Sequence, residues 1–250
     1  MRFPGALTAL LLFCPLAWAG EPLSDEPAQE TKEPFSSASF LTKLTVSAYF
    51  VGKDKNLDLN LRHTFGAVVA WAGYYLDTGG PPQGRLGGEY DAQWGILSLV
   101  PTIQLGTNGL VAGSIYSELG GKAFLIGGFS RTNLKPFYNL SFDPNESIQA
   151  GGGVRLSGQD RLSAFIIFDD RLSTGQQDTH VVLRHHLGKS SRLTLDGIFK
   201  SGHTDDGRFV RALGWIVSFQ RGRYFSRVAW DPYVNFTEDR MIRVGGGLRF

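Results

Sequence analysis

From residue 40 to the C-terminus, the sequence is a series of segments in which apolar and polar side chains alternate, each about ten residues long, which is the length of a transmembrane strand. In one segment, Leu57, Leu59 and Leu61 alternate with Asp58, Asn60 and Arg62. A β-strand turns successive side chains to opposite faces, whereas a helix would need apolar residues near every 3.6 positions. The alternation therefore predicts strands, each with one apolar and one polar face.

The last segment shows the same pattern. Its apolar face holds Ile242, Val244, Gly246, Leu248 and Phe250, and the opposite face holds Arg243, Gly245, Gly247 and Arg249. After residue 40 there is no run of eighteen consecutive apolar residues, so we expect no transmembrane helix. A soluble β-sandwich and a membrane β-barrel both remain compatible with the alternation.

The first nineteen residues differ from the rest of the chain. Arg2 precedes a short apolar run, and Ala17-Trp18-Ala19 forms a small-x-small site. This is the pattern of a secretory signal peptide, so we expect residues 1–19 to be removed after Ala19. Cys14, the only cysteine, lies in this segment, which predicts a mature chain without disulfides or thiolate metal sites. Lipidation of Cys14 is the less favoured alternative, because the bulky Phe13 precedes it.

Residues 20–39 are polar and acidic, contain prolines, and have few apolar side chains. Such a stretch buries too little apolar surface to fold, so we interpret it as a disordered periplasmic segment. A plug or a docking segment for a partner protein is the alternative. The chain as a whole has 25 basic and 23 acidic residues, a balance that predicts no nucleic-acid partner.

Three features favour a membrane barrel. The signal peptide exports the chain, and the chain ends on a predicted strand at Phe250. Aromatic residues also lie near segment ends, where amphipathic rings would meet the bilayer interface; they are Tyr49, Phe50, Trp71, Tyr74, Tyr75, Tyr90, Trp94, Tyr116, Trp215, Phe219, Tyr224, Trp230 and Tyr233.

The C-terminal strand resembles the assembly signal of bacterial outer-membrane β-barrel proteins, which Val244, Gly246, Leu248 and Phe250 would carry. The resemblance implies an all-β fold, a closed antiparallel transmembrane barrel over residues 40–250, located in the cell outer membrane. It also implies contact with outer-membrane lipid and lipopolysaccharide, and with the barrel-insertion machinery. Physical chemistry agrees, because an open sheet edge leaves unpaired backbone groups in hydrocarbon.

Turn-forming clusters divide residues 40–250 into fifteen strands if a break near Thr132–Asn133 is counted. An odd number would be unusual for a bacterial barrel. Treating Arg131–Glu146 as one extracellular excursion gives fourteen strands, our prediction, with twelve as the alternative if short hairpins merge. Either count predicts a lumen wider than that of an eight-stranded barrel.

The polar faces define the residues that we expect to line the lumen, where buried charges must be paired or hydrated. These candidates are Asp58, Arg62, Arg85, Glu89, Asp91, Tyr116, Glu118, Arg155, Arg184, Asp196, Arg243 and Arg249. They could form a paired network that takes the place of an apolar core, or they could select solutes in a channel. Arginines modestly outnumber acids in the set, which predicts a weak anion preference.

The leading functional hypothesis is a narrow channel or binding barrel for a small polar solute. A structural or accessory envelope barrel is one alternative. A lipid-modifying hydrolase of the outer leaflet, acting on lipid A or phospholipid, is another. The outer-membrane barrels with that activity carry a His-x-Ser element, and no histidine here is followed two positions later by serine: His63, His180, His185, His186 and His203. We therefore predict no catalytic residues, no cofactor and no metal site.

Overall fold

The computed structural model describes residues 40–135, 138, 143–156, 160–188, 190–204 and 206–250. The predicted signal peptide and the acidic segment lie outside this part of the chain. The strands are β1 (Thr42–Val51), β2 (Asp54–Phe65), β3 (Val68–Leu76), β4 (Gln83–Tyr90), β5 (Ala92–Trp94), β6 (Leu97–Gly106), β7 (Leu110–Gly120), β8 (Ala123–Thr132), β9 (Ser147–Arg155), β10 (Arg161–Asp169), β11 (Gln177–His186), β12 (Ser191–His203), β13 (Phe209–Arg221), β14 (Tyr224–Asp231) and β15 (Met241–Arg249).

Two short 3-10 turns, η1 (Thr107–Gly109) and η2 (Val234–Phe236), interrupt this succession of strands. Within the described residues, no helix is long and apolar enough to cross a bilayer.

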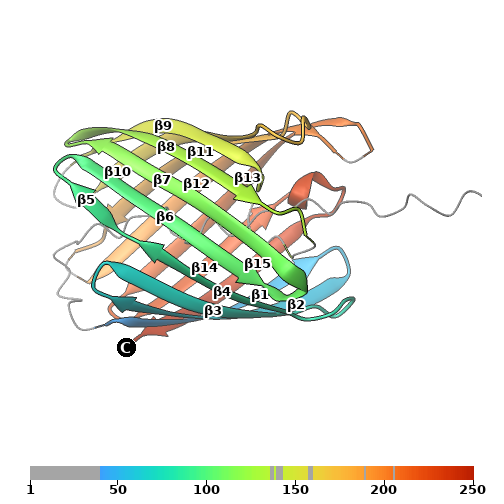
Figure 1. Cartoon of the computed structure of the whole chain (residues 1–250), viewed down its shortest axis with the longest axis horizontal. Helices are drawn as coiled ribbons and strands as arrows, with labels where there is room; N and C mark the ends of the chain where they lie inside the picture. Colours follow the sequence, from blue (N-terminus) through green and yellow to red (C-terminus); the bar gives the residue numbers. More distant parts are fainter. Residues whose placement is uncertain (1–39, 136–137, 139–142, 157–159, 189, 205) are drawn as a thin grey trace, which may run out of the picture.

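The strands form one closed antiparallel ring (Figure 1). β1 pairs with β15 from Lys43↔Arg249 to Val51↔Met241, and the ring closes on its other side where β4 and β5 both pair with β6. β4 and β5 therefore occupy one position in the wall, interrupted at Asp91. The prediction of a fourteen-stranded all-β barrel is confirmed, and the twelve-stranded alternative is wrong.

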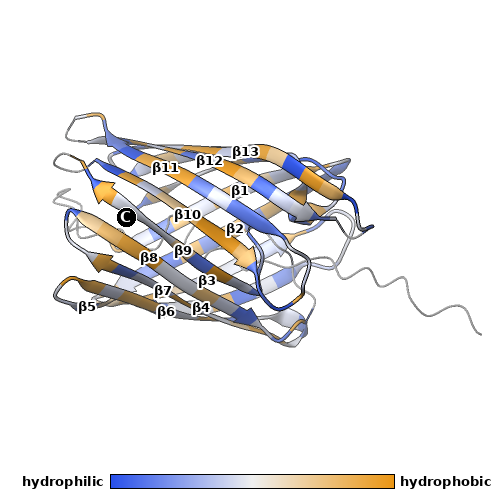
Figure 2. Cartoon of the chain, turned by 90° about the horizontal axis from the view of Figure 1, so that it is seen from above, coloured by the Kyte–Doolittle hydropathy of each residue, from blue (hydrophilic) through white to orange (hydrophobic). Residues whose placement is uncertain are grey.

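The outer face of the ring is apolar. Every strand contributes at least one exposed large apolar side chain, such as Leu59, Phe129 and Leu213. Figure 2 shows hydrophobic and hydrophilic residues alternating along the strands. An apolar surface that surrounds a whole barrel exceeds what soluble monomers expose and is the pattern of membrane-spanning barrels.

The two ends of the barrel differ. We call the end at which β1 begins and β15 ends the termini end; its six connections are short, such as residues 66–67 and 222–223. The opposite, loop end carries the longer connections, including 77–82, 133–146, 170–176 and 232–240. Short periplasmic turns and longer extracellular loops are the usual arrangement in outer-membrane barrels, and the loop end corresponds to the predicted extracellular side.

The seam between the first and last strands involves the C-terminal residue. The Thr42 amide donates to the Phe250 carbonyl over 2.9 Å, and the Phe250 amide donates to the Thr42 carbonyl over 2.8 Å. Val244 and Phe250 are exposed on the outer face. The assembly role of Val244, Gly246, Leu248 and Phe250 stays a prediction.

The prediction of an aromatic belt at the bilayer interfaces is wrong for four residues. Tyr49, Trp71 and Tyr75 are buried and Tyr116 is half-buried, all on the opposite face from the exposed apolar residues of their strands. Glycines make room for such inward rings, since a Cβ on Gly87 would collide with the Trp71 indole. The sequence shows which aromatic residues lie near a strand end. Whether such a ring faces lipid or lumen depends on whether it falls on the apolar or the polar side of the two-residue alternation.

Candidate functional site

The candidate site is the inner face of the barrel. Six of the twelve predicted residues are buried: Asp58, Arg85, Glu118, Arg184, Arg243 and Arg249. The other six are half-buried: Arg62, Glu89, Asp91, Tyr116, Arg155 and Asp196. Those within strands alternate with exposed apolar side chains, so they lie on the face turned away from lipid.

One group of charges joins β2 to β4. Arg85 donates to Asp58, and Arg62 donates to Glu89 over 2.7 Å. The strand between them, β3, has Gly73 opposite Arg85. A Cβ on Gly73 would stand 3.2 Å from the Arg85 guanidinium and 3.2 Å from the Asn60 amide nitrogen. The missing side chain therefore lets Arg85 reach across β3 to Asp58.

A second group surrounds Glu118 on β7. Its carboxylate accepts hydrogen bonds from Arg161, from Arg155 over 3.0 Å, and from the Tyr116 hydroxyl over 2.8 Å. The predicted set contains Tyr116, Glu118 and Arg155 but omits Arg161. The alternation of Arg161 and Ser163 with Leu162 and Ala164 could have identified Arg161.

A third group lies toward the loop end on β12 and β14. Lys200 donates to both carboxylate oxygens of Asp231, over 2.9 and 3.1 Å, and to the Tyr233 carbonyl over 2.8 Å. Both side chains of this ion pair are 0% exposed. Asp178 faces Lys200 in register on the neighbouring strand β11. It is also fully buried, and neither of its carboxylate oxygens has a hydrogen-bond partner.

His180 on β11 lies between two carboxylates. Its Nδ1 is 3.0 Å from Asp196, and its Nε2 is 2.8 Å from Asp143. The ring stacks on Phe165 with centroids 4.8 Å apart. Asp143 belongs to the connection between β8 and β9, so this contact brings a residue of the 133–146 excursion against the inner wall.

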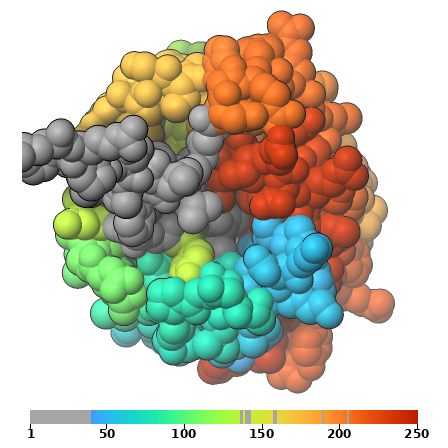
Figure 3. Space-filling view, turned by 90° about the vertical axis from the view of Figure 1, so that its right-hand side faces the viewer, coloured from blue at the N-terminus to red at the C-terminus, as the bar shows by residue number. Residues whose placement is uncertain are grey.

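The same excursion also contacts the facing wall. The Tyr138 amide donates to Gln83 over 2.8 Å, and the Tyr138 ring lies 4.5 Å from that of Tyr75 on β3. β3 and β11 are seven positions apart in either direction round the ring, so they face each other across the lumen. Described residues of the excursion thus contact two opposite walls near the loop end. Figure 3 views the barrel from this end.

Tyr138 itself stays protonated near neutral pH. Burial raises the pKa of the Tyr138 phenol to about 12, and a hydrogen bond to Asp77 contributes to the increase. The group therefore acts there as a neutral hydrogen-bond donor.

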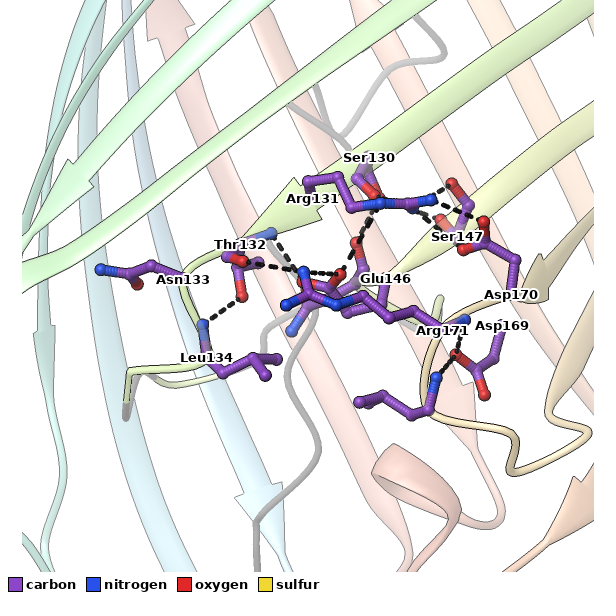
Figure 4. Close-up of polar contacts among 12 residues, drawn as sticks. Ser130, Arg131, Thr132, Asn133, Leu134, Glu146, Ser147, Asp169, Asp170 and Arg171 are labelled. Carbon is purple, nitrogen blue, oxygen red and sulfur yellow. Dashed lines mark hydrogen bonds and ion pairs between the residues drawn. The ribbon is translucent and has the colours of Figure 1, made fainter.

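The C-terminal end of the excursion is held by Glu146, which is 1% exposed. Its carboxylate accepts from the Thr132 amide over 2.6 Å and from Arg171 over 2.9 Å. Arg131 adds a two-pronged ion pair with Asp170, over 2.9 and 2.6 Å (Figure 4). These contacts connect β8 and Glu146, which directly precedes β9, to the β10–β11 loop at the loop end of the barrel.

The hydrolase alternative requires a histidine beside a serine. Among the described residues, four histidines bond groups other than serine: His63 bonds Thr42, His180 bonds Asp143 and Asp196, His185 bonds Asp160, and His203 bonds the Thr174 carbonyl. A serine nucleophile needs a base within hydrogen-bonding reach. Nor does this part of the chain group three His, Cys, Asp or Glu side chains in a way that could hold a metal ion.

No protein-family model matches the sequence, and no curated protein matches it. Solved structures do resemble the fold. The outer membrane protein Omp33 of Acinetobacter baumannii aligns with a TM-score of 0.54 and 8% identity, over 84% of this chain and 98% of that one. The KdgM porin aligns at 0.48 with 9% identity, over 83% and 99% of the two chains. The NanC porin aligns at 0.47 with 7% identity, over 83% and 100%.

Proposed function

We propose that the protein is an outer-membrane channel through which small polar solutes pass. The observation that carries the proposal is the closed fourteen-stranded ring with an apolar outer face and a charged inner face. The apolar outer face is suited to contact with lipid chains. The charged inner face provides groups that can replace water around a polar solute.

The width of the lumen supports a narrow passage. A ring of fourteen strands lies between the eight-stranded barrels that side chains fill and the wide aqueous porins. Tyr138 contacts β3 and Asp143 contacts the facing strand β11, and these two contacts support a constriction at the loop end. Solutes would therefore enter through this constriction and not through an open tube.

Location and partners follow from the same proposal. The short turns would face the periplasm, and the long loops would face outward among lipopolysaccharide. The C-terminal residues from Val244 to Phe250 would be recognised by the barrel-insertion machinery, and the apolar outer face would then contact outer-membrane lipid. The fold of Omp33 of Acinetobacter baumannii, itself an outer membrane protein, supports this location.

Conductance in planar lipid bilayers tests the proposal. Purified protein should give discrete current steps in potassium chloride, and liposomes containing it should swell in small polar solutes but not in large ones. The wild-type protein and a protein-free detergent control are compared under the same conditions. Absence of current steps and of swelling at every salt concentration would contradict a channel function and leave the binding or accessory barrel as the better explanation.

A further inference from the structure

A row of hydrogen-bond donors crosses the outer face of the barrel at the termini end. Ser191 on β12 lies in direct register with Arg221 on β13, and Arg221 lies in register with Tyr224 on β14. Side chains in direct register on neighbouring strands share a face of the sheet. Arg221 continues the outward series of Val217 and Phe219 along β13, so the whole row lies on the face turned toward lipid.

The β13–β14 turn brings a second arginine to this row. Gly222 and Arg223 alone connect the two strands, and the left-handed backbone of Gly222, with a φ of 56°, allows the tight hairpin. The Arg223 carbonyl accepts from the Arg249 amide over 2.8 Å, and the Arg223 guanidinium donates to the Tyr224 hydroxyl over 2.9 Å. Both the backbone and the side chain of Arg223 are therefore held beside the Tyr224 ring.

These two arginines have no counter-ion in the described part of the chain. Neither Arg221 nor Arg223 forms an ion pair there, and the carboxylate of Phe250 on the neighbouring strand pairs with neither. Every residue of β12 to β15 is described, and the acids of these strands are Asp196 and Asp231. Both belong to the inner-face ion pairs described above. Two exposed guanidinium charges thus remain on the lipid side of the wall.

The rest of the outer face at this end has a different character. Its large exposed side chains are mainly apolar or aromatic, such as Phe65, Val68, Tyr90, Trp94 and Leu119. His185 is exposed as well, but its ring bonds the Asp160 carboxylate over 2.7 Å. Lys122 is exposed in the β7–β8 turn, on the other side of the ring. Positive charge on the lipid side is therefore concentrated at the β13–β14 hairpin.

The surroundings of the hairpin match a phospholipid with an anionic headgroup. A guanidinium presents forked N–H donors to phosphate oxygens, and the Ser191 and Tyr224 hydroxyls are further hydrogen-bonding groups at the same level. Tyrosine is also typical of the depth at which headgroups meet acyl chains. Further along β13, the side chains of Phe219 and Val217 are 39% and 37% exposed and offer apolar surface to the acyl chains of the same molecule. A free phosphate ion would use the donors alone.

We propose that Ser191, Arg221, Arg223 and Tyr224, which we call the arginine patch, bind the headgroup of an anionic phospholipid in the periplasmic leaflet of the outer membrane. The leaflet follows from the short turns of the termini end, which face the periplasm in barrels of this kind. The patch lies on the outside of the wall, so its ligand does not depend on whether solutes pass through the lumen.

Lipid binding to the detergent-solubilised protein tests the assignment. Native mass spectrometry compares the affinities for phosphatidylglycerol, which is anionic, and phosphatidylcholine, which is zwitterionic, with the same acyl chains. The wild-type protein should prefer phosphatidylglycerol. A basic residue near a membrane surface increases affinity for anionic lipid about fivefold. Arg221→Gln should therefore lose part of the preference, and Arg221→Gln/Arg223→Gln should lose most of it.

Two variants serve as controls. Arg211→Gln removes the same charge from an exposed, outward position on the same strand but near the loop end, and it should keep the preference for phosphatidylglycerol. Arg221→Lys/Arg223→Lys retains both charges of the patch and should also keep the preference. This second variant separates loss of charge from loss of folding, which heat-dependent gel mobility reports independently.

Three results would each overturn the proposal: equal affinity of the wild type for both lipids, a preference that survives Arg221→Gln/Arg223→Gln, or an equal loss in Arg211→Gln. Inorganic phosphate provides a further test of the ligand class. It should not displace bound phosphatidylglycerol at matched concentration, because the free ion has no acyl chains to contact Phe219 and Val217. Displacement would identify a simple anion site and overturn the assignment to a lipid.

Discussion

The ion pair of Lys200 with Asp231 is predicted to be a principal source of stability at the loop end, and Asp231→Asn tests this. The substitution keeps the shape of the side chain but removes the charge that Lys200 contacts through both carboxylate oxygens. Both side chains are 0% exposed, so water cannot replace the lost partner. Breaking such a pair from one side costs about 3–5 kcal/mol, because it leaves a charge buried without its counter-ion.

Asp178→Asn is the matched control. Asp178 is in register with Lys200 and equally buried, but no hydrogen bond reaches either of its carboxylate oxygens. A buried carboxyl group without hydrogen bonds is itself a cost. We therefore expect Asp178→Asn to leave the free energy of unfolding unchanged or to raise it, although it alters the carboxyl group that faces the same lysine.

Guanidinium unfolding in detergent micelles, followed by tryptophan fluorescence and extrapolated linearly to zero denaturant, gives both free energies. We expect the free energy of unfolding of Asp231→Asn to be about 3–5 kcal/mol lower than that of Asp178→Asn. Equal losses in the two variants would refute it, because proximity of charge and not the hydrogen-bonded pair would then determine the stability. A Lys200→Met/Asp231→Leu double variant should recover most of the loss, since it removes both charges together.

Two further predictions concern the wall and the turns. Gly247→Ala should cost about 1–3 kcal/mol of unfolding free energy, because its Cβ would press on the Leu44 carbonyl and the Phe225 ring at the seam; Gly197→Ala, with no atom within 4 Å, is the control, and heat-dependent gel mobility compares them. Hydrogen bonds from the His186 amide and the His185 ring lower the pKa of Asp160. The stabilisation that these hydrogen bonds provide should be complete above the unfolded-state pKa of about 3.9 and should vanish as pH falls through the folded-state pKa. The free energy of unfolding is measured against pH for the wild type and for Asp160→Asn. A difference between the two free energies that persisted in acid would contradict this prediction.

The sequence by itself determined the strands and their two faces, and it favoured fourteen strands while leaving twelve as the alternative. Side-chain direction in a strand has a period of two residues, so Leu57 to Arg62 reveal both the lipid face and the polar face without any knowledge of neighbours. The parity argument that merged residues 131–146 into one excursion also needed only the requirement that both chain ends lie on one side. For the same local reason, eleven of the twelve lumen candidates could be placed on the inner face of a strand, and Asp91 lies between two strands.

Only the tertiary structure decided which polar groups meet. Asp58 reaches Arg85 across Gly73, and Glu118 on β7 binds Arg161 on β10, because strand register and ring closure bring together residues that are far apart in sequence. The contacts of Asp143 with His180 and of Tyr138 with Tyr75 depend on the path of a long connection, about which strand periodicity carries no information. Local alternation therefore specifies the faces of the barrel, whereas the partners within it depend on distances that arise only when the ring closes.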